Sequence, residues 1–239
     1  MRGFILSLDP AQVRDWSALA AVKAVWKAET KTFTYRLVNI ERLQKVPYDE
    51  IVAWTIRAFR TPAFRQDVSF GPILCLDSTG VGVAIRDMFL KAGVQPVSIS
   101  ITSGNGHSVV GGDRHVGKAR LIGKFLAAFD AGRFQIPDKE TPALVQLQRE
   151  LKSFRAELST AGNARFEAEP GEHDDLVLAC SMAAWFGEDV LKDRNVGPLV
   201  FSGATKPHTF GSGRSGGGWF AEAARHHGGG SEFLGGIHH

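Results

Sequence analysis

Three acidic positions that lie far apart along the chain have the sequence context of metal ligands. Asp9 and Asp77 each end a short apolar run typical of a buried strand, and the adjacent Asp174 and Asp175 begin an apolar segment typical of a buried helix. Carboxylates that meet at one crevice repel each other unless divalent cations join them. Oxygen ligands without cysteine favour Mg²⁺ or Mn²⁺, and two such ions can drive phosphodiester cleavage. The predicted chemistry is therefore hydrolytic.

Each acidic residue also has a simpler interpretation. Asp9 suits a turn before Pro10, Asp77 suits a cap of the helix that follows it, and the aspartate pair suits the solvated start of a helix. Asp15 could lie near the same crevice, but a turn role is favoured. His173 could act as a general base or as an outer-shell donor, although histidines at helix starts usually have neither role.

The segments between these residues predict the sheet that brings them together. Short connections join the first three predicted strands, which favours an antiparallel meander. The fourth strand, a small-residue turn, a helix and the fifth strand have the order of a βαβ crossover. If the fourth strand pairs in parallel with the first, Asp9 and Asp77 project from neighbouring carboxyl ends, about 4.8 Å apart. The five predicted strands span residues 4–9, 15–25, 32–40, 72–77 and 94–101.

The rest of the chain predicts helices and connecting loops. Residues 103–112 are rich in Gly and Ser, which predicts a mobile loop or hairpin. Residues 155–169 predict a hairpin that leads to the aspartate pair. The predicted helices before that pair span residues 47–59, 83–92, 115–131 and 140–154.

Basic residues of the 115–131 helix are candidates for DNA contacts. Lys118, Arg120 and Lys124 lie on its predicted polar face, where they could contact phosphates. A solvated polar face is the simpler interpretation of the same pattern.

Composition limits the domain organisation and the class of protein. The 239 residues are 44% hydrophobic, which suits one core, so residues 1–190 are predicted to form a single domain. Residues 191–239 are rich in Gly and His and predict a disordered tail, whose histidines we give no role. Cys75 and Cys180 lie in apolar runs, so neither a disulfide scaffold nor a cysteine metal cluster is expected. No signal sequence or membrane span is apparent, which predicts a soluble intracellular protein without a membrane partner.

Three motifs resemble those of a known family, the nuclease domain of the large terminase subunit of tailed bacteriophages, which belongs to the ribonuclease H-like superfamily. The resemblance covers about residues 3–187 and implies an α/β fold with a central mixed sheet of five or more strands, in the order 3-2-1-4-5, flanked by helices. In chain order, the motifs are Leu8-Asp9-Pro10-Ala11 with Asp15-Trp16-Ser17-Ala18, Leu76-Asp77-Ser78-Thr79-Gly80-Val81-Gly82, and Gly171-Glu172-His173-Asp174-Asp175-Leu176-Val177-Leu178-Ala179.

Carried over position by position, the resemblance implies that Asp9, Asp77 and Asp175 are the catalytic and metal-binding triad, with Asp174 as a neighbouring metal-binding acid. The implied activity is endonuclease cleavage of concatemeric viral DNA during genome packaging, with two Mg²⁺ or Mn²⁺ ions, in the cytoplasm of the infected bacterial host. The implied partners are double-stranded DNA, a packaging ATPase domain, the small terminase subunit and the portal. The Gly-x-x-x-x-Gly-Lys-Ser/Thr loop of such an ATPase does not occur here, so we expect this chain alone not to translocate DNA.

Two other functions stay open from the sequence. A Holliday-junction resolvase or a transposase-like nuclease would have the same fold and the same acids. A noncatalytic DNA-binding or motor-docking module would keep the fold while its acids serve no reaction.

Overall fold

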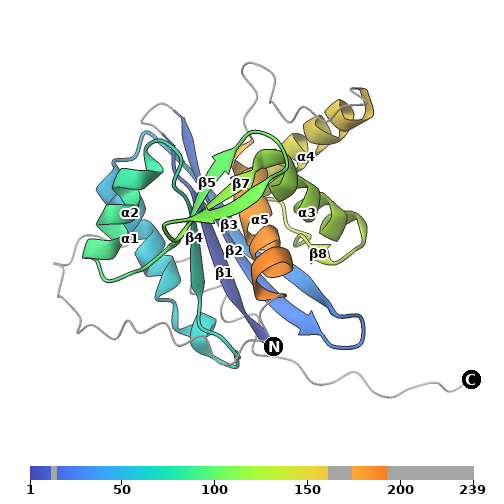
Figure 1. The fold of residues 1–239 in the computed structure, drawn as a ribbon, viewed down its shortest axis with the longest axis horizontal. Helices are drawn as coiled ribbons and strands as arrows, with labels where there is room; N and C mark the ends of the chain where they lie inside the picture. The colour runs from blue at the N-terminus through green and yellow to red at the C-terminus, as the bar shows by residue number, and fades with distance from the viewer. Residues whose placement is uncertain (12–14, 161–173, 193–239) are drawn as a thin grey trace, which may run out of the picture.

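The computed structural model of the chain describes residues 1–11, 15–160 and 174–192. Within them, an eight-stranded mixed sheet separates two layers of helices (Figure 1). The strands are β1 (Arg2–Asp9), β2 (Trp16–Lys27), β3 (Thr32–Gln44), β4 (Ile73–Asp77), β5 (Val97–Thr102), β6 (His107–Val110), β7 (Asp113–Gly117) and β8 (Phe134–Gln135). The helices are α1 (Tyr48–Phe59), η1 (Pro62–Arg65), α2 (Gly82–Lys91), α3 (Lys118–Asp130), α4 (Pro142–Thr160), α5 (Asp175–Trp185) and the π-helical η2 (Phe186–Leu191).

The strand order is β6-β7-β5-β4-β1-β2-β3-β8. The predicted order 3-2-1-4-5 is therefore present at the centre of the sheet, with β8 added at one edge and the β6–β7 hairpin at the other. β1, β2 and β3 form the predicted antiparallel meander, and β4 pairs in parallel with β1 and with β5. The predicted α/β class with a central mixed sheet is confirmed.

Side chains alternate across the strands and form one core on each face of the sheet. On β1, Leu6 and Leu8 pack into the core beneath α1 and α2, whereas Ile5 packs into the core beneath α3, α4 and α5. Figure 1 shows α1 and α2 on one side of the sheet and α3, α4 and α5 on the opposite side. The position of an acidic residue at the end of a strand therefore determines which of the two helix layers its side chain faces.

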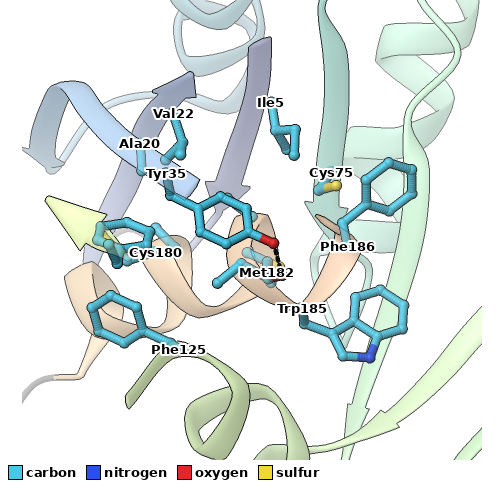
Figure 2. Close-up of a cluster of buried hydrophobic side chains, with 14 of the residues drawn as sticks. Ile5, Ala20, Val22, Tyr35, Cys75, Phe125, Cys180, Met182, Trp185 and Phe186 are labelled. Atoms are coloured by element: carbon cyan, nitrogen blue, oxygen red, sulfur yellow. Dashed lines mark hydrogen bonds between the residues drawn. The ribbon is translucent and has the colours of Figure 1, made fainter. Parts of the chain in front are cut away.

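The helix α5 is buried along its whole length, as its unbroken apolar sequence predicts. It lies between the sheet and the helices α3 and α4. In Figure 2 its residue Met182 lies beside Tyr35 of β3, and Trp185 lies on the side of Phe186. A helix so enclosed holds its first residue in a fixed position relative to the strands.

Three sequence-based predictions need correction or stay open. The predicted helix 115–131 begins only at Lys118, because residues 115–117 pair in parallel with β5 as the end of β7. The predicted hairpin is wrong in its first arm, since residues 155–160 continue α4 with helix-favouring Ala, Glu and Leu. Its second arm and the predicted tail beyond Lys192 lie outside the described residues, so the domain boundary stays a prediction. None of the described helices combines the length and the hydropathy that crossing a bilayer requires.

Candidate active site

Two of the predicted ligands lie side by side at the carboxyl ends of two central strands of the sheet. Leu8 of β1 pairs with Leu76 of β4, so the next residues, Asp9 and Asp77, lie at the carboxyl ends of adjacent parallel strands. Adjacent strands are about 4.8 Å apart, and residues in register project to the same face. That face is the one that α5 covers, because Ile5, in phase with Asp9, belongs to the core beneath it.

The start of α5 brings the third position to the same place. Ser7 Oγ donates a hydrogen bond to Ala179 O at 2.6 Å, which fixes the middle of α5 against β1. Asp175 lies four residues before Ala179, or about 6 Å along the helix, and Asp9 lies two residues beyond Ser7, or about 6.6 Å along the strand. Both carboxylates therefore lie at the same end of the central strands, the end where β1 and β4 finish.

The carboxylates lie close enough to perturb one another. Burial raises the pKa of Asp9 well above its ordinary value of 3.8, and the charges of Asp77, Asp175 and Asp174 raise it further. The Lys118 ammonium partly opposes this increase. The structure thus brings all four sequence-predicted metal ligands into one electrostatic cluster, whose mutual repulsion a bound cation would relieve.

Asp77 also has the structural role that its simpler interpretation predicts. Its Oδ1 accepts a hydrogen bond from the Thr79 N–H at 2.8 Å, which holds the turn between β4 and α2. Burial raises the pKa of Asp77, while the hydrogen bonds with Thr79 lower it in part. The turn is tight, because a Cβ at Gly82 would lie 2.0 Å from the Asp77 carbonyl oxygen. The small residues of this motif therefore fit the turn that presents Asp77 at the strand end.

Two basic side chains neutralise the aspartate pair. The Arg42 guanidinium contacts both oxygens of Asp175, with Nε–Oδ2 at 2.7 Å and Nη2–Oδ1 at 2.8 Å. Lys118 Nζ forms an ion pair with Asp174. The side chain of Asp175 is 10% exposed, so it is not the solvated residue of the simpler interpretation.

A β-bulge brings Arg42 to this face of the sheet. The pairing of β2 with β3 skips one residue, Val38, at a register shift. Up to Leu37 the odd-numbered residues of β3 face α5, whereas beyond the bulge the even-numbered residues do. Arg42 lies opposite Ala18, which in turn lies opposite Asp9, so arginine and aspartates share one register row. The sequence did not indicate Arg42, because the predicted third strand ends at residue 40 and an unbroken alternation would place residue 42 on the other face.

A buried glutamate of α4 holds the first turn of α5. Glu150 is 3% exposed and accepts hydrogen bonds from the Leu176 and Val177 N–H groups, both at 3.1 Å. The N-cap residue Asp174 makes no side-chain cap hydrogen bond, so Glu150 takes that place. Burial, together with the nearby charge of Asp175, raises the pKa of Glu150 to about 8. Its helical sequence pattern gave no reason to single it out, because the contact is tertiary.

The three basic residues predicted to contact DNA have partners within the protein. Lys118 forms an ion pair with Asp174 of the acidic cluster, as described above. Arg120 Nε and Lys124 Nζ contact the two oxygens of Asp189, at 2.6 Å and 3.0 Å, and so tie α3 to η2. A contact between any of the three and DNA stays a prediction. Asp15 is exposed, in keeping with a turn role, and His173 lies outside the described residues.

The donor set fits a hard divalent cation, although its side chains are held by other cations. Every candidate ligand is a carboxylate, and a shared 2+ ion would remove the repulsion recorded in the pKa of Asp9. Among residues 1–11, 15–160 and 174–192, no three His, Cys, Asp or Glu side chains are placed to hold one ion. A divalent ion at Asp174 or Asp175 would compete with Lys118 or Arg42 for the same carboxylate.

Comparison with known proteins identifies the fold. No protein-family model and no curated protein sequence matches the chain. The human cytomegalovirus terminase nuclease domain, in a Mn-soaked structure, is similar with a TM-score of 0.51 at 13% identity, over 79% of this chain and 85% of that chain. The large terminase nuclease of the thermophilic phage G20c with bound magnesium matches with a TM-score of 0.45 at 18% identity, over 77% of this chain and 80% of that one. The chain thus has a fold like that of the cytomegalovirus terminase nuclease domain, an α/β fold as predicted.

Proposed function

We propose that this chain is a metal-dependent DNA endonuclease that cuts concatemeric viral DNA during genome packaging, by two-metal hydrolysis of phosphodiester bonds. The observation that carries the proposal is the placement of Asp9 and Asp77 at the ends of adjacent parallel strands, against which Ser7 fixes the helix that begins with Asp174 and Asp175. Burial raises the pKa of Asp9, and the charges of the other three carboxylates raise it further. The terminase nuclease-like fold supports the same conclusion.

Each acid of the cluster has a role in this proposal. Asp9, Asp77 and Asp175 are the catalytic ligands that would hold Mg²⁺ or Mn²⁺, and Asp174 is an additional ligand. Bound divalent ions would supply an activated water and stabilise the leaving oxygen of the cleaved bond. Glu150 fixes the helix turn that carries Asp175, so that its carboxylate keeps one position relative to the strand ends.

The substrate and partners belong to the proposal as well. Double-stranded DNA is the expected substrate, and its phosphates need cations beside the acidic cluster, where Lys118 and Arg42 lie. We further propose that the chain acts with a packaging ATPase domain, a small terminase subunit and a portal, in the cytoplasm of an infected bacterial host. These partners follow from the motif resemblance.

Plasmid cleavage tests the proposed reaction. The protein is expected to nick and linearise supercoiled plasmid in Mn²⁺ or Mg²⁺ and to leave it intact in chelator, because the carboxylates alone do not activate water. A linear duplex and a four-way junction of matched sequence serve as parallel substrates.

The substrate pattern separates the alternatives. Cleavage of the linear duplex at a rate similar to that of the junction favours a packaging nuclease. Cleavage confined to the junction would favour a resolvase. DNA binding without cleavage in either metal would favour the noncatalytic module and contradict the proposal.

A further inference from the structure

Arg42 occupies the carboxylate that a metal ion would need. Its guanidinium binds both oxygens of Asp175, and the two side chains are 11% and 10% exposed. A two-pronged contact of this kind uses the oxygen lone pairs that lie in the carboxylate plane. A carboxylate has about four such lone pairs, so a divalent ion that binds Asp175 on the side covered by Arg42 needs one that the guanidinium already uses. Arg42 and the ion therefore compete for the same side chain.

Trp16 gives Arg42 a second support. The Arg42 Cζ atom lies 4.4 Å from the centroid of the Trp16 ring, a distance typical of a cation–π contact. This contact does not involve Asp175, so it can hold the guanidinium beside the site when the carboxylate changes partner. Ala18, which has a small side chain, is the residue that lies between Arg42 and Asp9 across the paired strands.

We propose that Arg42 is a positioning residue that exchanges partners: it holds Asp175 in the metal-free protein and turns to a DNA phosphate when a divalent ion takes that carboxylate. The inference rests on the proposed nuclease function. The planar fork of a guanidinium matches phosphate as well as it matches carboxylate, so the exchange keeps its charge paired. Arg42 thus neutralises Asp175 before the metal binds. When the metal ion replaces it there, the guanidinium becomes free to pair with a negatively charged phosphate of the substrate.

Calorimetric titration with Mn²⁺, without DNA, tests the competition. Arg42→Gln is expected to bind Mn²⁺ at least about fivefold more tightly than the unchanged protein, the lower end of typical coupling between two binding events. Arg42→Lys, which cannot contact both oxygens in the same way, is expected to fall between the two. Arg36→Gln, the same charge change at an exposed position of β3, is the matched control and should leave the affinity unchanged.

Weaker Mn²⁺ binding by Arg42→Gln would overturn the inference, since Arg42 would then organise Asp175 for the metal. Unchanged binding by both Arg42 variants would overturn it too. Circular dichroism and thermal melting establish that each variant is folded, and Arg42→Lys keeps the buried charge if Arg42→Gln does not fold.

Steady-state cleavage tests the exchange to phosphate. Arg42→Gln is expected to need less Mn²⁺ but more DNA for half-maximal rate, because it loses a competitor of the metal and a partner of the phosphate. A purely structural role would raise both requirements, and that result would contradict the inference. If the unchanged protein binds no Mn²⁺, the proposed function fails along with the inference. If it binds Mn²⁺ and Arg42→Gln binds no more tightly, the inference alone fails.

Discussion

Asp77→Asn is expected to lower the rate of metal-dependent plasmid cleavage by at least about 10³-fold, since a metal ion contributes several kcal/mol to the reaction and each 1.4 kcal/mol is about tenfold in rate. The fold should be kept, because an Asn oxygen can still accept the hydrogen bond from the Thr79 N–H that holds the turn. Only the charge that would hold the metal is lost.

The control is Asp87→Asn, the same change at an exposed position of α2. It is expected to cleave at the rate of the unchanged protein, and thermal melting of both variants reports on folding. Cleavage by Asp77→Asn within about threefold of the unchanged rate would show that Asp77 holds no metal needed for the reaction, a difference of under about 0.7 kcal/mol in the barrier.

Asp9→Asn is expected to stabilise the metal-free protein at neutral pH while it abolishes cleavage. The pKa of Asp9 is raised in the folded state above its ordinary value of 3.8, so the folded protein binds this proton more tightly than the unfolded chain. The free energy of unfolding therefore falls as pH rises from near that value through the raised pKa, by up to about 1.4 kcal/mol per pH unit for each such proton. Asn removes both the proton and the repulsion.

Thermal melting in chelator from about pH 4 to about pH 8 measures this effect over the range where stability depends on native carboxyl groups. The unchanged protein should melt at lower temperature as pH rises, with Asp77 and Glu150 contributing in the same direction. Asp9→Asn should show a shallower dependence and the higher melting temperature above neutral pH. Addition of Mn²⁺ should raise the melting temperature of the unchanged protein more than that of the variant. A variant that is less stable at every pH would refute the mutual repulsion of these acids.

Local sequence patterns predicted the parts of the site that depend on strands. Asp9 and Asp77 end apolar runs whose parallel pairing follows from the crossover between β4 and β5, so their neighbourhood could be inferred. The position of Asp175 could be inferred because an apolar helix of that kind must be buried against the sheet. Its first residue then lies close to the strands.

The residues around the acids could not be predicted from such patterns. Arg42 reaches the site only because the bulge at Val38 reverses the alternation of β3, and nothing local marks that residue as a bulge. Glu150 acts on α5 through a contact between helices that are separate in sequence. The boundary between β7 and α3 was misplaced for a similar reason, since pairing with β5 decides it.

The most direct measurement locates the metal itself. In crystals of the protein soaked in Mn²⁺, anomalous diffraction is expected to place manganese between the carboxylates of Asp9, Asp77 and Asp175, with the Arg42 guanidinium moved off Asp175. Manganese bound elsewhere, with the Arg42–Asp175 ion pair intact and no ion at the strand ends, would contradict the claim that these carboxylates form a metal centre.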